Sequence, residues 1–174
     1  NITPKNQDNG GKNVIKHDSI VSKQLLYDKE VAHQIADLGQ LLEESHYNDV
    51  CSRLKDKGYR SGFTCLFYGA PGTGKTETLF QLARQTGRDI LQVNISEIKS
   101  MWVGASEKNI KSVFDQYRAR VDKASVAPIL LFNEADAIIG KRQEGAERAV
   151  EKMENSIQNI ILQEMETLNG ILIA

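Results

Sequence analysis

Hydrophobic residues recur along the chain at two different spacings, and segments of the two kinds alternate. Residues 28–42 carry apolar side chains three and four positions apart, which predicts an amphipathic helix. Further segments with this spacing predict helices: residues 47–57, 76–86, the residues that follow Ser106, and 148–168. Short apolar runs predict buried strands: residues 63–68, 89–93, 128–132 and 171–174. Strands that alternate with helices indicate an α/β fold with a mostly parallel sheet covered on both faces.

The same pattern divides the chain into three parts. Residues 1–24 carry scattered charges, Asn and Gly with little periodicity, which predicts a flexible arm or linker. We expect an N-terminal helical segment over residues 25–62 and the core of the fold over residues 63–174. The chain has no initial Met and stops directly on a predicted buried strand, so we expect it to be a piece of a longer protein.

The composition is that of a folded, water-soluble protein, with 40% hydrophobic and 26% charged residues. A net charge of −1 argues against a protein that binds nucleic acid or anionic lipid through bulk charge. The densest apolar run, residues 126–132, is too short to cross a bilayer. Cys51 and Cys65 match no metal-ligand spacing, and Cys65 lies in an apolar run, as a small buried residue would. We therefore predict a reduced, cytoplasmic protein with neither a membrane nor a nucleic acid as partner.

The clearest motif lies between the strand predicted at residues 63–68 and the helix that follows it. Residues 69–76 read Gly-Ala-Pro-Gly-Thr-Gly-Lys-Thr and match G-x-x-x-x-G-K-[ST] at every fixed position. Glycines allow successive backbone N–H groups to surround a phosphate, and the helix adds its positive end. Lys75 would reach the outer phosphates, and the Thr76 hydroxyl would bind Mg²⁺. The predicted nucleotide-binding residues are Gly69, Ala70, Pro71, Gly72, Thr73, Gly74, Lys75, Thr76, Glu77 and Asn133.

A second polar element follows the strand predicted at residues 128–132. A nucleotide hydrolase of this kind normally places Asp and then Glu here, the Asp to hold the water shell of the metal and the Glu to polarise the attacking water. Glu134 occupies the position of the base, which makes it a candidate catalytic residue together with Lys75. Asn133 occupies the position of the Asp and keeps one acceptor oxygen without the charge. The predicted metal ligands are therefore Thr76 and Asn133, the latter through water.

Three interpretations of Asn133 compete. It is a natural variant that still hydrolyses nucleotide, an engineered trap, or the mark of a site that binds without hydrolysing. The natural variant is favoured because the sequence carries no other sign of inactivation. Asp136 has two interpretations, a residue that holds neighbouring loops and a solvated helix cap.

The only tryptophan, Trp102, lies in an otherwise polar loop with Met101 and Val103 beside it. An isolated tryptophan is usually packed in a core. Here Ser100 and Gly104 flank the group and favour a loop tip, where a large exposed aromatic ring could contact a partner.

These motifs together resemble the AAA family of ATPases, the protein-remodelling branch of the AAA+ superfamily. Residues 69–76 match its Walker A motif, and residues 129–136 are similar to its Walker B segment apart from Asn133. Residues 101–104, followed by 106–110, are similar to its pore loop 1 and to the helix after that loop.

The resemblance covers roughly residues 63–174 and implies a P-loop NTPase fold, a three-layer αβα sandwich. It implies a homo-hexameric ring that binds ATP and Mg²⁺ between subunits and threads a polypeptide substrate through its pore, where Trp102 and Val103 would contact it. It also implies parts beyond Ala174: the last strand of the sheet, a polar residue that positions the attacking water, arginine fingers and a helical lid. Because these parts are missing from the chain as given, we expect it to bind ATP, to hydrolyse it very slowly, and to be a monomer.

Some residues keep two interpretations. Leu25, Leu26 and Tyr27 could contact adenine, as residues upstream of the first strand do in the family, but core contacts are favoured. Basic residues after the second motif could face a neighbour's nucleotide, but a solvated surface is favoured: Lys141, Arg142 and Arg148. The histidines show no partner spacing and are expected at the surface: His17, His33 and His46.

Three classes of function remain. The leading one is an ATPase that remodels proteins, and the second is a regulatory or scaffold module that binds nucleotide without turnover because of Asn133. The third is a nucleic-acid machine such as a clamp or helicase loader, which shares the P-loop core. Near-neutral charge and the lack of a basic face with interleaved aromatic residues disfavour this third class. The loop at Trp102 favours a peptide substrate.

Overall fold

The computed structural model describes residues 12–95, 106–135 and 149–174. Its centre is a five-stranded sheet in the order β1-β3-β4-β5-β2. The strands have the bounds β1 Lys12–Ile15, β2 Phe63–Cys65, β3 Ile90–Asn94, β4 Ile129–Asn133 and β5 Ile171–Ile173. Neighbouring strands are parallel except β1 and β3, which are antiparallel. The mostly parallel sheet expected from the hydrophobic pattern is therefore confirmed.

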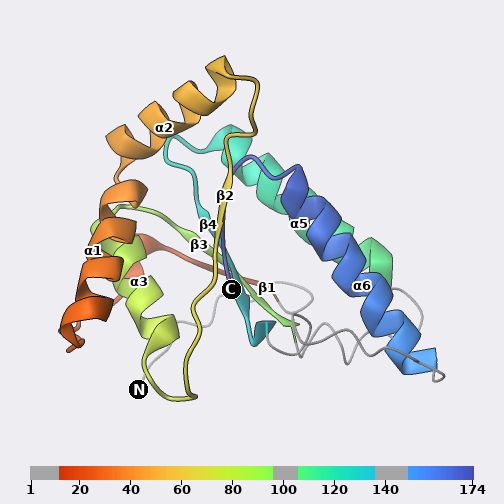
Figure 1. Ribbon diagram of the computed structural model, residues 1–174, viewed down its shortest axis with the longest axis horizontal. Coiled ribbons are helices and arrows are strands. Elements are labelled where there is room, and N and C mark those ends of the chain that lie inside the picture. Colours follow the sequence, from red (N-terminus) through yellow and green to blue (C-terminus); the bar gives the residue numbers. More distant parts are fainter. Residues whose placement is uncertain (1–11, 96–105, 136–148) are drawn as a thin grey trace.

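Helices cover both faces of the sheet (Figure 1). One layer contains α1, α2 and α3, and the opposite layer contains α5 and α6. The bounds are α1 Lys29–Leu42, α2 Glu44–Asp56, α3 Lys75–Gln85, α5 Ser106–Lys123 and α6 Ala149–Glu166, with a short 3₁₀ helix, η1, at His17–Ser19. This three-layer αβα arrangement is the one expected for a P-loop NTPase.

The central strands are buried on both faces, and alternate residues point to the two helix layers. In β4, Ile129 and Leu131 pack in the core beneath α1, α2 and α3, whereas Leu130 and Phe132 pack in the core beneath α5 and α6. Burying one such side chain stabilises the fold by roughly 1.5–3 kcal/mol relative to leaving it exposed. Because both faces of β4 are covered, its sequence is a continuous apolar run rather than an alternating one.

The order of the strands decides which loops meet. From β2 the chain passes through α3 to β3 on the far side of the sheet, and then returns through β4 to β5, which lies between β4 and β2. The carboxyl ends of these parallel strands therefore lie along one edge of the sheet. In open α/β sheets this edge is where ligands bind, so the residues that follow β2, β3 and β4 form the region of interest.

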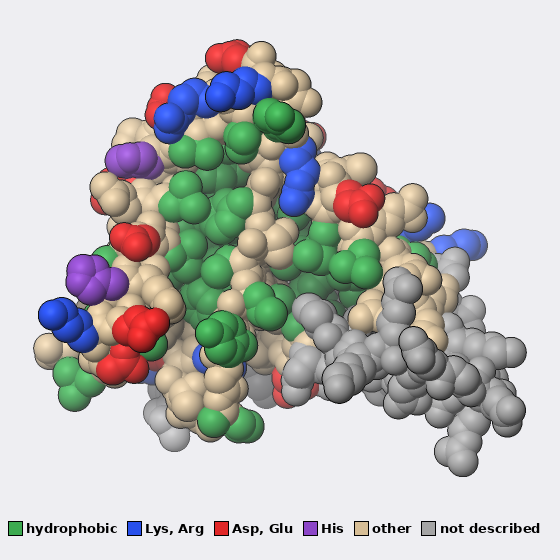
Figure 2. Space-filling view, viewed as in Figure 1, with side chains coloured by type: hydrophobic (Ala, Val, Ile, Leu, Met, Phe, Trp, Pro, Cys, Tyr) green, Lys and Arg blue, Asp and Glu red, His purple; other side chains and the backbone are tan. Residues whose placement is uncertain are grey.

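Strand β2 lies at one side of the described sheet, with β5 on its inner side and no described strand on its outer side. Hydrophobic side chains flank its backbone on the face shown in Figure 2. Two large side chains that follow it are exposed, Leu66 at 54% and Tyr68 at 89%. An unpaired strand edge with apolar neighbours is a surface that a further strand can cover.

The predicted and observed bounds differ most at two elements. Helix α2 begins at Glu44 rather than at residue 47. Glu43 is both the C-cap of α1 and the N-cap of α2, and the first residues of α2 are exposed and mostly polar, so hydrophobic spacing carries no signal for this turn. Strand β2 ends at Cys65 rather than at residue 68, where the chain leaves the sheet toward the glycine-rich loop.

The structure differs from the predicted flexible arm over residues 12–24. Strand β1 pairs with β3 along its whole length, and η1 follows it. The Asp89 carboxylate lies 2.6 Å from the Lys16 ammonium, accepts the His17 backbone N–H at 3.1 Å, and lies 2.9 Å from the His17 ring nitrogen. A short edge strand has too few apolar residues to be recognised by periodicity. His17 was expected at the surface without a partner, and it is half-buried.

Residues 25–62 share a core with the rest of the fold. Leu42 and Tyr47 belong to the same buried cluster as Leu79 and Leu82 of α3. The division of the chain into three parts stays a prediction, but its second part packs directly on the third.

Two smaller expectations concern cysteine and the membrane. Cys51 and Cys65 are half-buried free thiols, so Cys65 is less buried than its apolar neighbours led us to predict. Burial still raises the pKa of the Cys65 thiol. Among the described helices, none has the length and apolar character needed to span a bilayer.

Candidate nucleotide-binding site

The glycine-rich loop, residues 69–76, leads from β2 into α3 at the carboxyl edge of the sheet. Besides Gly69, with φ 147°, two of its glycines have left-handed backbone conformations, Gly72 with φ 78° and Gly74 with φ 86°. A Cβ at either position would meet no atom within 4 Å, so backbone conformation rather than space demands glycine. The tight curve of the loop depends on glycine at these two positions.

The loop ends at the N-terminus of α3, where Gly74 is the N-cap. In the described part of the chain, no side chain caps this end of the helix. The first backbone N–H groups of α3 are therefore available to an acceptor from outside, and the helix dipole favours a negatively charged one. Proteins bind phosphate groups with this arrangement.

Lys75 folds back across the loop. Its ammonium donates hydrogen bonds to the carbonyl oxygens of Gly69, at 2.8 Å, and Ala70, at 2.9 Å. The Thr73 hydroxyl also donates to the Ala70 carbonyl, at 2.8 Å. An ammonium has three donors, so Lys75 keeps one that these two bonds do not use. A cation, an uncapped helix end and glycine turns together fit the phosphates of a nucleotide.

A pocket of about 680 Å³ joins this loop to the end of β4. The predicted site residues that line it are Gly69, Pro71, Gly72, Lys75, Thr76, Asn133 and Glu134. The fold thus brings together two motifs that are far apart in the sequence. Ala70, Thr73 and Gly74 complete the loop without lining the pocket.

Asn133, the last residue of β4, is half-buried, and its side-chain nitrogen lies 3.4 Å from Asn94 Oδ1. Asn94 ends β3 and is the register partner of Asn133 across the two parallel strands. Its Oδ1 also accepts a hydrogen bond from Gln92, at 3.2 Å. An aspartate at position 133 would have no N–H to donate to Asn94 Oδ1, and it would keep the contact only if the Asn94 amide turned over. The amide at this position is therefore matched to its neighbour on β3.

Glu134 follows β4 in a turn and has φ 58°, a left-handed conformation that is unusual for a residue with a side chain. Such a conformation costs about 1–3 kcal/mol and occurs preferentially at functional sites. The side chain is exposed and lines the pocket. The turn therefore places a solvated carboxylate at the pocket, where it could accept a proton from water.

The donor chemistry of the pocket fits Mg²⁺. The Thr76 hydroxyl and the Asn133 amide supply oxygen atoms, and both residues line the pocket. Mg²⁺ prefers oxygen ligands and usually binds through few protein groups, with water and substrate phosphates completing its shell. Thr76 and Asn133 are therefore the residues that would hold it.

Glu77 lies outside this pocket. Its carboxylate accepts hydrogen bonds from Lys23, at 2.7 Å, and from Gln81, at 2.9 Å. The hydrogen bond from Lys23 is the main reason that the pKa of Glu77 lies below its ordinary value, against an opposing effect of burial. The Glu77 side chain thus points toward residues 20–28 and away from the pocket, while its backbone N–H lies in the first turn of α3. Its part in nucleotide binding stays a prediction.

Several other residues of the sequence analysis also lie away from the pocket. Leu26 is 92% exposed, and the Tyr27 hydroxyl lies 3.0 Å from the Thr78 hydroxyl. Leu25 and Tyr27 line a separate pocket of about 370 Å³ beside α3. Residues that lie outside the described ranges are Trp102, Val103, Asp136, Lys141, Arg142 and Arg148.

Some residues of the site were not identified from the sequence. Asn94 contacts Asn133, and Leu66 and Tyr68 line the pocket next to the glycine-rich loop. The feature of the sequence that could have identified them is their position, because each follows or ends a strand at the carboxyl edge of a parallel sheet.

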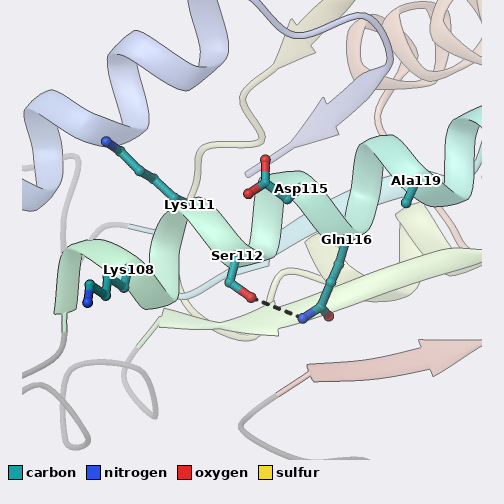
Figure 3. Close-up of a pocket in the computed structure, with 6 residues that line it drawn as sticks. All are labelled: Lys108, Lys111, Ser112, Asp115, Gln116 and Ala119. Carbon is teal, nitrogen blue, oxygen red and sulfur yellow. Dashed lines mark hydrogen bonds between the residues drawn. The ribbon is translucent and has the colours of Figure 1, made fainter.

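Another pocket, of about 500 Å³, lies along the exposed side of α5 (Figure 3). All the residues that line it come from this one helix: Lys108, Lys111, Ser112, Asp115, Gln116 and Ala119. Figure 3 shows Lys108 and Lys111 pointing in different directions, while Gln116 donates a hydrogen bond to Ser112 at 3.1 Å. Its polar groups do not converge on one point, so the pocket at the glycine-rich loop is the stronger candidate.

Comparisons with known proteins agree with this geometry. The family model described as ATPase family associated with various cellular activities (AAA) matches residues 65–174. A vesicle-fusing ATPase from Arabidopsis thaliana is 35% identical over 131 residues, which cover 71% of this chain and 17% of the relative. Protein CdcH from Halobacterium salinarum is 35% identical over 105 residues, which cover 58% of this chain and 13% of the relative. The matched segments therefore cover less than a fifth of the length of either relative.

Proposed function

Because the chain belongs to the AAA family of ATPases, we propose that it is the ATP-binding core of an enzyme that couples the hydrolysis of Mg-ATP to the remodelling or unfolding of proteins. The observation that carries this proposal is the single pocket shared by Lys75, Thr76, Asn133 and Glu134. A phosphate-binding loop that shares a pocket with a candidate base supports transfer of a phosphoryl group to water.

Phosphate binding is the role of the loop and of Lys75. The bonds that Lys75 makes to neutral carbonyl oxygens are weaker than bonds to phosphate, because with phosphate both the donor and the acceptor carry a charge. Its ammonium would therefore exchange the carbonyls of Gly69 and Ala70 for phosphate oxygens. The open N–H groups at the start of α3 would bind the same phosphates.

Activation of water is the role of Glu134. Its carboxylate would take the proton of the attacking water as the oxygen–phosphorus bond forms, while the bond to the leaving diphosphate breaks. Thr76 and Asn133 would hold Mg²⁺, which when bound offsets the negative charge on the transferred group.

A second candidate function is a nucleotide-binding regulatory or scaffold module without turnover. It is supported by Asn133, which lacks the charge of the usual Asp and contacts Asn94 instead. Loss of a charged hydrogen-bond acceptor can weaken metal binding by roughly 1.5–3 kcal/mol.

Calorimetric titration of the chain with ATP, with and without Mg²⁺, tests nucleotide binding. We expect binding that tightens with Mg²⁺ and that is lost in Lys75→Ala, because the ammonium contacts the outer phosphates. Lys57→Ala is the matched control, since Lys57 is exposed after α2 and does not line the pocket. Binding that needs Lys75 but ignores Mg²⁺ would favour the second candidate. Absence of binding, also in a longer chain, would contradict both candidates.

The intact protein separates the two candidates by its hydrolysis rate. We expect measurable turnover that disappears in Glu134→Gln while nucleotide binding persists. Absence of turnover in the unmodified protein would favour the non-hydrolysing module.

The partners are proposed from the family resemblance, and the location in the cell from the composition and the cysteines. They are a homo-hexameric ring, a polypeptide substrate contacted by Trp102 and Val103, and the cytoplasm. Nucleic acid is not among the proposed partners, and a salt-sensitive micromolar complex with DNA would contradict this part of the proposal.

A further inference from the structure

Residues 20–28 connect η1 to α1 without forming a helix or strand, and we call them the strap. The strap begins where the Ile20 carbonyl accepts a hydrogen bond from Arg84, in the last turn of α3, at 3.2 Å. It ends near Tyr27, whose hydroxyl lies 3.0 Å from that of Thr78 in the first turn of α3. The strap therefore runs antiparallel to α3 and reaches the end of the helix that carries the glycine-rich loop.

Polar side chains bind the middle of the strap to α3. Gln81 is 7% exposed, and its amide donates to the Val21 carbonyl, at 2.9 Å, and accepts the Lys23 backbone N–H, at 3.1 Å. The Lys23 ammonium forms an ion pair with Glu77 at 2.7 Å. These contacts hold the strap in one position along the helix, and so fix where Tyr27 lies.

The hydroxyl of Thr78 links Tyr27 to the glycine-rich loop. Thr78 is 5% exposed, and its hydroxyl donates to the Gly74 carbonyl at 3.0 Å. A hydroxyl has one proton, so Thr78 must act as acceptor toward Tyr27, and Tyr27 must be the donor. The result is a directed chain of hydrogen bonds from Tyr27 through Thr78 to Gly74.

The Gly74 carbonyl also accepts the backbone N–H of Thr78, at 2.8 Å. Two hydrogen bonds therefore fix the direction of this carbonyl. Because the peptide bond is planar, the carbonyl of Gly74 and the N–H of Lys75 point in opposite directions within one rigid plane. Fixing the carbonyl toward the helix thus aims the Lys75 N–H outward, to where the loop would bind phosphate.

We propose that Tyr27 is a positioning residue for phosphate binding, acting through Thr78 to hold the peptide between Gly74 and Lys75 in the orientation that presents its N–H to the nucleotide. This inference rests on the proposed function of the pocket. Neither Tyr27 nor Thr78 lines the pocket, so Tyr27 would act on nucleotide binding through the hydroxyl of Thr78.

Tyr27→Phe tests the proposal because it removes the hydroxyl and keeps the ring. We expect the dissociation constant for ATP to rise about three- to tenfold, the effect of one hydrogen bond. Tyr59→Phe is the matched control, since Tyr59 is 65% exposed and lines no described pocket near α3, and it should bind ATP like the parent. A Tyr27→Phe chain that binds ATP as tightly as the parent would overturn the proposal.

A double-mutant cycle with Thr78→Val separates positioning from general packing. If Tyr27 acts through Thr78, adding Tyr27→Phe to Thr78→Val weakens ATP binding no further. If the two substitutions weaken ATP binding independently, so that their effects on the binding free energy add in full, then the chain of hydrogen bonds from Tyr27 through Thr78 to Gly74, here called the relay, is refuted. A purely structural role would lower the melting temperature and leave the affinity of the folded chain unchanged.

Amide resonances of the chain without nucleotide test the relay independently of ATP binding. Tyr27→Phe should shift the backbone amide resonance of Lys75, whereas Tyr59→Phe should not. If neither the parent nor a longer chain binds ATP, the proposed function fails, and the Lys75 resonance alone then decides whether the relay exists. An unmoved Lys75 resonance overturns the relay, whatever the binding result.

Discussion

Among single residues, Arg88 is a buried charged group that joins separate segments of the chain. It is 1% exposed, and its guanidinium donates to the Leu42 carbonyl, at 2.8 Å, and to the Ala127 carbonyl, at 2.6 Å. It also lies over the Tyr47 ring, 4.7 Å from the centroid. One of its nitrogens, Nη2, has no partner in the described part of the chain, and burial lowers the pKa of Arg88. This desolvated cation lies at the end of α1, where it donates hydrogen bonds to the carbonyl groups of two separate segments.

Arg88→Lys should destabilise the fold by about 1–3 kcal/mol, because an ammonium cannot reproduce the planar pair of bonds and the stacking on Tyr47. Urea unfolding measures this as a lower midpoint at an unchanged slope. Arg53→Lys is the control, since Arg53 forms an exposed ion pair with Asp49, and its midpoint should barely move. Equal midpoints for the two variants would contradict the role of Arg88.

The sequence identified some functional residues and missed others for a definite reason. The loop at Lys75 was recognisable because its glycines and its helix are neighbours in the chain. The contacts of His17 and Tyr27 were not recognisable, since their partners Asp89 and Thr78 lie 72 and 51 positions away. A polar residue in a segment without periodicity gives no indication of a partner that only folding supplies.

Among the secondary-structure elements, β1 and η1 depend on one carboxylate at the start of β3. Partial burial raises the pKa of Asp89, but the hydrogen bonds from Lys16 and His17 outweigh it, so the pKa lies below its ordinary value. The folded-state pKa is therefore lower than that of the unfolded chain. The ionised carboxylate stabilises the fold above the ordinary Asp pKa of about 3.9, and this contribution disappears as the pH falls through the folded-state value.

Asp89→Asn should therefore be less stable than the parent at neutral pH, with a difference that shrinks as the pH falls toward about 3. Urea unfolding across this pH range measures the difference. Asp49→Asn, in an exposed ion pair, is the control and should differ little from the parent throughout. A deficit for Asp89→Asn that stays constant with pH would show that Asp89 acts by packing alone.

Across the whole molecule, the strand order places the parts of the site. Strand β5 lies between β2, which leads into the glycine-rich loop, and β4, which ends at Asn133. The pocket therefore lies between the ends of β2 and β4, two strands that are not consecutive in the sequence. In the described sheet, the outer side of β2 carries no strand.

The 174-residue chain by itself should sediment as a monomer of 19.4 kDa, with and without ATP. Its hydrolysis rate should be lower than that of the intact protein by a factor on the order of 10³–10⁵, the contribution of an arginine finger to phosphoryl transfer. Sedimentation and a phosphate-release assay on the chain and on the intact protein test both statements. A hexamer that forms on addition of ATP, or equal turnover rates, would contradict them.

The sequence by itself determined the types and the order of the elements from about residue 28 onward, and it identified the glycine-rich loop, but it missed β1 and η1. These depend on hydrophobic spacing and on backbone conformations that are set within one or two turns, as at Gly72 and Gly74. Only the tertiary structure decided that β5 separates β2 from β4, that the strap lies along α3, and that Asn133 contacts Asn94. The physical reason is that such contacts join residues far apart in the chain. Their free energy depends on which surfaces pack together, and no local preference of the backbone records that choice.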